Sequence, residues 1–71
     1  MNDWKIEITG FPDIRRIMRD EHIVGFANRQ GNGRWAALDS EGTRLTNETF
    51  DSPRRVLIWI QNADSKKTRE M

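Results

Sequence analysis

The sequence predicts an α+β domain in which an antiparallel β-meander of three to four strands packs against a C-terminal helix. Three observations lead to this prediction. Glycine-centred turns lie at residues 31–33 and 39–42, short runs alternating apolar and polar residues flank them, and residues 51–53 read Asp-Ser-Pro, typical of a helix start. Such a meander buries one face of its sheet under the helix and leaves the other free for a partner.

Four runs of residues have the alternation and the boundaries of β-strands. They cover residues 4–9, 22–29, 34–39 and 43–50. Asn32 and Gly33 can both adopt positive φ, so we expect a tight hairpin turn there. Gly25 is typical of a bulge or of a close approach by another part of the chain. Leu45 and Phe50 have opposite parity, which indicates a bulge or an early end of the last strand.

Residues 12–19, between the first two strands, have the pattern of a short helix. Pro12 suits the first helical position, and Ile14, Ile17 and Met18 are spaced as one apolar stripe over roughly two turns. A helix of this length is stable only when it packs against the rest of the domain. We therefore expect it to lie against the sheet after the first strand.

The C-terminal helix is expected to begin at Ser52 and Pro53, which suit the N-cap and the first helical position. Residues 56–60 form an unbroken, β-branched run, so residues 54–61 also fit a buried strand. The Asp-Ser-Pro entry favours the helix. Its apolar stripe then leaves Ile58 near solvent or a partner.

Length and composition limit the protein to a small class. The 71 residues include 12 Lys or Arg, 11 Asp or Glu and no Cys, with a formal net charge of +1. We expect one domain at residues 1–64, followed by a frayed polar tail at 65–71. The absence of Cys excludes disulfides, thiolate zinc sites and cysteine nucleophiles. Because the sequence has neither a membrane-spanning run nor the pattern of a secretory signal, we expect a cytoplasmic protein without a membrane partner.

Residues for catalysis or for cofactor binding are scarce. His22 is the only histidine, and no sequence signature of a catalytic nucleophile accompanies it. The chain has no tyrosine, so the usual proton-transfer residues are nearly absent. Residues 20–22 are Asp, Glu and His, all of which can bind a metal ion. Consecutive side chains on a helix or strand do not point toward one centre, however, which argues against a metal site there. The glycines at 31–33 lack the lysine and the strand–loop–helix context of a phosphate-binding loop. The sequence therefore predicts a protein that is not an enzyme and holds no cofactor or metal.

The candidate binding surface is the open face of the sheet. If Ala36 and Leu38 face the helix, alternation places Trp35 on the open face, with Arg29 and Arg44 on the neighbouring strands and Arg34 beside them. A Trp between arginines can stack on bases or anchor a protein interface. The opposite register buries Trp35 and turns Leu38 outward, and both registers remain open.

Two further groups of arginines are secondary candidates for contact with a partner. They are Arg15, Arg16 and Arg19, and Arg54 with Arg55 at the start of the C-terminal helix. Cations at a helix N-terminus oppose the helix dipole, so the second group costs some stability. Such a cost is compatible with a role in binding, although solvated surface is the commoner explanation for groups of this kind.

The segments Gly33-Arg-Trp-Ala-Ala, Gly42-Thr-Arg and Thr49-Phe-Asp-Ser resemble the AP2-type DNA-binding domain, and the resemblance covers residues 24–63. That family, like the arm-binding domains of phage integrases, places a three-stranded sheet in the DNA major groove with a helix behind it. The resemblance implies Arg29, Arg34, Trp35 and Arg44 as the DNA-facing residues. In size and architecture the chain is also similar to small phage- and plasmid-encoded accessory proteins, including anti-CRISPR proteins, which occlude a surface of a larger complex.

These observations favour a non-enzymatic binding module, with DNA or RNA binding through the open face as the first hypothesis. The alternative is a protein-binding accessory protein or inhibitor that occludes a surface of a host complex, which the balanced charge favours. A homodimer is a third hypothesis, because small cores often need one.

Overall fold

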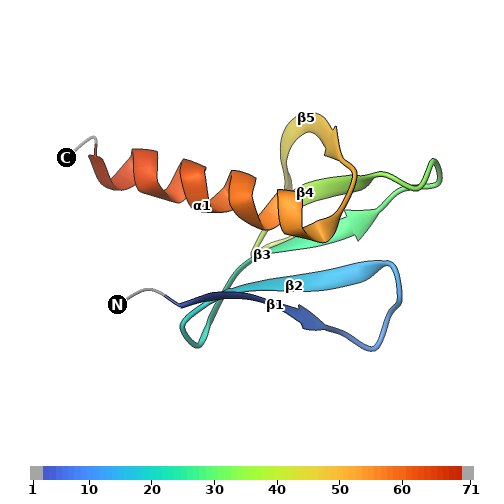
Figure 1. Cartoon of the computed structure of the whole chain (residues 1–71), viewed down its shortest axis with the longest axis horizontal. Coiled ribbons are helices and arrows are strands. Elements are labelled where there is room, and N and C mark those ends of the chain that lie inside the picture. Colours follow the sequence, from blue (N-terminus) through green and yellow to red (C-terminus); the bar gives the residue numbers. More distant parts are fainter. Residues whose placement is uncertain (1–2, 70–71) are drawn as a thin grey trace.

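A computed structural model of the chain describes residues 3–69 as one antiparallel sheet and one helix (Figure 1). The elements are β1 (Trp4–Ile8), β2 (Ile14–Arg19), β3 (His22–Arg29), β4 (Trp35–Asp39), β5 (Arg44–Phe50) and α1 (Pro53–Arg69). Each strand pairs with the next one in the chain, so the order in the five-stranded sheet is β1-β2-β3-β4-β5. The α+β meander with a C-terminal helix is therefore confirmed. Among residues 3–69, no helix has the length and apolar character needed to cross a membrane.

The short helix expected after the first strand is wrong, because Ile14–Arg19 is strand β2 and pairs with β1 on one side and β3 on the other. The residues that resembled one helical stripe are divided between two faces: Ile17 is fully buried under α1, and Ile14 lies on the opposite face. Between two strands, this short segment satisfies its backbone groups on both sides, which a two-turn helix cannot do. The sheet thus has five strands, whereas three to four were expected.

The glycine turns differ in detail from the expectation. Gln30 and Arg34 close the β3–β4 hairpin, where the N–H of Gln30 donates to the carbonyl of Arg34 at 2.7 Å. Gly33 has a φ of 84°, whereas Asn32 does not adopt positive φ. The connection is therefore a three-residue loop with a left-handed glycine, and the tight Asn-Gly turn is wrong. The β4–β5 turn repeats this geometry at Gly42, whose φ is 88°.

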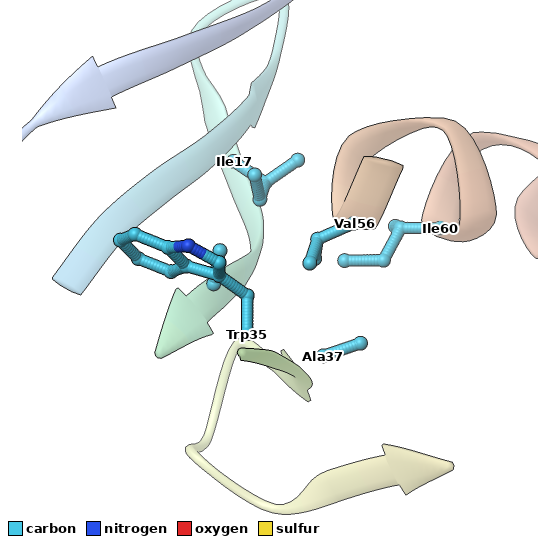
Figure 2. Close-up of a cluster of buried hydrophobic side chains, with 6 residues drawn as sticks. Ile17, Trp35, Ala37, Val56 and Ile60 are labelled. Carbon is cyan, nitrogen blue, oxygen red and sulfur yellow. The ribbon is translucent and has the colours of Figure 1, made fainter. Parts of the chain in front are cut away.

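The core lies between α1 and one face of the sheet, which we call the covered face. Its buried members are Ile17, Ala27, Trp35, Ala37, Val56 and Ile60. Figure 2 shows Val56 and Ile60 pointing from α1 toward the sheet. A Cβ atom added at Gly25 would lie 3.0 Å from Cδ1 of Ile60 and 2.4 Å from the carbonyl oxygen of Leu38. Both the backbone of β4 and a side chain of α1 therefore come close to Gly25, and the close approach expected at this glycine is confirmed.

The start of α1 follows the sequence signals. The Oγ of Ser52 accepts the N–H of Arg55 at 3.3 Å, and Pro53 is the first helical residue. Val56 is fully buried, whereas Ile58 is 38% exposed, as the apolar stripe predicts. α1 continues to Arg69, so its last turn lies within the segment expected to be a frayed tail. Residues 70–71 lie outside the described residues.

Candidate binding surface on the open face of the sheet

The face of the sheet opposite α1, which we call the open face, has one row of side chains that crosses all five strands. From β1 to β5 the row is Glu7, Arg16, Phe26, Leu38 and Arg44. A second row, from β2 to β5, is Ile14, Asn28, Ala36 and Thr49. Residues directly opposite each other in an antiparallel sheet have their side chains about 5 Å apart on the same face. The first row therefore has an apolar centre between two arginines.

An apolar hollow lies at the middle of the open face. Ile14, Phe26 and Leu38 line it together with Asn28 and Gly42, and its volume is about 220 Å³. The three apolar side chains are only partly buried, although they lie on the three central strands. This hollow was not predicted from the sequence, because Ile14 was expected in a helix and the direction of Leu38 was left open. The strict alternation of residues 35–39 was the available signal, since it permits both registers.

Trp35 is not on the open face. Its side chain is 6% exposed and belongs to the core cluster (Figure 2). Of the two registers that the sequence left open, the one that buries Trp35 and turns Leu38 outward therefore holds, and Trp35 is wrong as a candidate binding residue. The physical reason is the area of the indole ring, which gains more free energy from burial than Ala36 or Leu38 would. Ala37, two residues along the same strand, is fully buried on the same face.

Arg29 is also on the covered face, where it pairs with Trp35 across the strands. The guanidinium carbons of Arg29 and Arg15 each lie 5.5 Å from the centroid of the Trp35 ring. Arg29 also forms an ion pair with Asp13, at 2.7 Å between Nη2 and Oδ1. In this position, Arg29 shields a core residue and its charge is balanced, so it does not join the candidate surface.

Arg34 and Arg44 lie on the open face, where they accompany Leu38 and not Trp35. The Nε of Arg34 donates to Oγ1 of Thr49 at 2.7 Å, and its Nη2 donates to the carbonyl of Thr49 at 2.9 Å. The Nε of Arg44 donates to the carbonyl of Thr46 at 2.9 Å. Neither arginine has an ion pair with a described residue. Their guanidinium groups are thus held in place by neutral acceptors and keep an unbalanced charge.

The basic residues of β2 do not form one patch. They are Arg15, Arg16 and Arg19. Because β2 is a strand, Arg16 lies on the open face, where it pairs with Glu7 at 2.8 Å. Arg19 lies on the covered face and pairs with Asp64 of α1 at 2.6 Å. The expected secondary patch is therefore divided between the two faces.

The remaining candidates lie outside the open face. Arg54 and Arg55 are exposed in the first turn of α1, and His22 is exposed at the start of β3. Among residues 3–69, no group of His, Asp and Glu is arranged to hold a metal ion.

No protein-family model, no curated protein and no solved structure matches this chain. The resemblance of residues 24–63 to AP2-type and integrase arm-type domains therefore stays a prediction. Of the four residues that it implies, Arg34 and Arg44 lie on the open face, and Arg29 and Trp35 lie on the covered face.

Proposed function

We propose that the chain is a non-enzymatic module that binds an acidic protein surface through the open face of its sheet. The observation that supports this proposal is the row across the five strands, in which Arg16 and Arg44 flank the apolar pair Phe26 and Leu38. α1 packs on the other face and leaves this row uncovered.

The chemistry of the row suits a protein partner. Phe26 and Leu38 are only partly buried, so a partner that covers them gains the free energy of removing apolar surface from water. Aromatic residues and arginines are enriched in protein interfaces, and an apolar centre with a polar rim is the usual arrangement there. Arg34 and Arg44 have no ion pair with a carboxylate within residues 3–69. Carboxylates on the bound protein would therefore form ion pairs with their guanidinium groups. In this proposal the chain acts by occluding the surface of a larger complex to which it binds.

The test compares capture by the unmodified protein with capture by two variants. Immobilised protein is exposed to nuclease-treated lysate, and the captured proteins are identified by mass spectrometry. We expect a protein that binds the unmodified chain and the control variant Arg54→Ala/Arg55→Ala, but not Phe26→Gln. Equal capture by Phe26→Gln would contradict a role of the open face.

Nucleic-acid binding through the same face is the second candidate function. It is favoured by Arg34 and Arg44, whose charges no described carboxylate balances, and by Phe26, which lies in the same row of the open face as Arg44, with Leu38 between them. An aromatic side chain beside arginines can stack on a base while the guanidinium groups hold phosphates. Neither Trp35 nor Arg29 takes part in this version of the proposal.

Fluorescence anisotropy with labelled single-stranded and duplex probes distinguishes the two functions. Nucleic-acid binding predicts an affinity that falls steeply as salt is added and that weakens in Arg34→Ala and Arg44→Ala. The control Trp35→Phe should leave such binding unchanged. Absence of binding to all probes at low salt would exclude this second function and leave the protein-binding proposal unaffected.

A further inference from the structure

β1 forms a free edge of the sheet, because it comes first in the strand order and pairs only with β2 among residues 3–69 (Figure 1). The carbonyl of Asp3 accepts the N–H of Asp20 at 2.7 Å. Backbone groups along an antiparallel strand alternate between its two sides, so the odd-numbered residues bond to β2 and the even-numbered ones point outward. The outward residues are Trp4, Ile6 and Ile8. Their N–H and C=O groups offer a regular pattern for a further strand.

We propose that β1 pairs antiparallel with β1 of a second copy of this chain, with Ile6 opposite Ile6. The register is allowed because Ile6 is one of the outward-pointing residues, so the two copies can exchange backbone hydrogen bonds at this pair. In this register Lys5 lies opposite Glu7 of the second copy, and Glu7 lies opposite Lys5. Opposite charges that face each other across strands attract, so the segment Trp-Lys-Ile-Glu-Ile is complementary to itself.

The apolar surface near this edge supports the same arrangement. Ile8 is 79% exposed and Ile58 of α1 is 38% exposed. A groove of about 420 Å³ runs between β1 and α1, with Trp4, Leu57 and Ile58 in its lining. A twofold axis perpendicular to the sheet keeps both helices on the same side. It places Ile8 next to Trp4 of the second copy and turns the two grooves toward each other.

The opposite edge of the sheet is less suited to such pairing. On β4 the step from Ala36 to Leu38 spans two residues, whereas the paired step on β5, from Thr49 to Arg44, spans five. β5 therefore bulges, as the parity of its apolar residues predicted, and bulges at edge strands hinder pairing with another chain. β1, in contrast, keeps an unbroken register over all its residues.

The test is a concentration series by sedimentation equilibrium on the unmodified chain and on charge variants. We expect the unmodified chain to dimerise, and Lys5→Glu and Glu7→Lys each to weaken the dimer by about tenfold or more, because each puts like charges opposite each other twice. An equimolar mixture of the two variants should restore dimers, since every facing pair is again of opposite sign. Glu48→Lys on β5 is the matched control and should dimerise like the unmodified chain.

Two results would overturn the proposal. One is an unmodified chain that stays monomeric over the whole series. The other is a dimer that Lys5→Glu and Glu7→Lys leave intact, or that their mixture fails to restore while circular dichroism shows both variants folded. The proposal does not depend on the function of the open face. If both hold, the dimer presents two open faces side by side on one continuous sheet.

Discussion

The two faces of the sheet are built from the same strands but from alternate residues, and they differ in what their apolar side chains do. On the covered face, Ile17, Ala27 and Ala37 have no exposed surface. On the open face, Phe26 and Leu38 remain partly exposed between arginines. The core cluster beneath α1 thus comes from the covered face, although Met18 and Ala36 on the open face are also buried. The partly exposed apolar side chains of the open face are therefore expected to contribute less to stability.

The largest expected effect comes from shortening a side chain on the covered face. Ile17→Ala removes a side chain with 0% exposure from beneath α1 and should lower the free energy of unfolding by about 2–5 kcal/mol. Ile14→Ala, the same change on the same strand but on the open face, should cost less than about 1.5 kcal/mol, because Ile14 is already partly exposed. Urea denaturation measures both. If both variants lost the same free energy of unfolding, the two faces would not differ in their contribution to stability.

A slightly smaller effect is expected from adding a methyl group where α1 approaches the sheet. In Gly25→Ala the new Cβ would lie 2.4 Å from a backbone oxygen, so strands or helix must shift, at a cost of about 1–3 kcal/mol. Gly31→Ala is the control, because nothing lies within 4 Å of a Cβ added there. Its melting temperature should stay close to that of the unmodified chain. A neutral Gly25→Ala would mean that the backbone of β4 does not approach Gly25 as closely as this.

Weakening the start of α1 tests how much the helix contributes to stability, without changing a side chain on either face of the sheet. Ser52→Ala removes the oxygen that accepts the N–H of Arg55, which should cost about 1 kcal/mol. Ser40→Ala, in the exposed β4–β5 turn, is the matched control and should be neutral. Thermal unfolding followed by circular dichroism compares the two. If the two variants melted together, Ser52 would not be an effective N-cap.

Local signals made much of this fold predictable from the sequence. The start of α1 depends on Ser52 and Pro53, and β3 was predicted with its observed bounds, because caps, turn glycines and alternation act within a few residues. β2 was missed because its apolar residues fit a helical spacing. The turn that ends β2 consists of Asp20 and Glu21 with Asp20 at a φ of 57°, and this pair lacks the glycine that usually marks a two-residue hairpin.

The candidate site was only half predictable, for a different physical reason. Alternation divides Trp35, Ala36 and Leu38 between two faces, but it does not say which face the helix covers. That choice depends on the fit of α1 against residues far away in the sequence, above all the small residues Gly25 and Ala27. Arg34 and Arg44 were named as candidates on the assumption that they share a face with Trp35, whereas Arg44 lies opposite Leu38 and Arg34 contacts Thr49, so their place on the open face follows from the other register.

The smallest expected effect concerns the edge of the covered face, where arginines complete the burial of Trp35. In a chain with Trp4→Phe and Trp59→Phe, the emission of Trp35 should be shielded from acrylamide, because its side chain is 6% exposed. Arg15→Ala should increase the quenching constant and cost about 0.5–1 kcal/mol, since it removes one guanidinium from 5.5 Å above the ring. Arg44→Ala changes an arginine of the open face and should leave the quenching unchanged. Strong quenching of Trp35 in the chain that keeps all its arginines would instead show that the indole is exposed to solvent. Trp35 would then belong to the open face, and the assignment of the two faces on which the proposed function depends would be wrong.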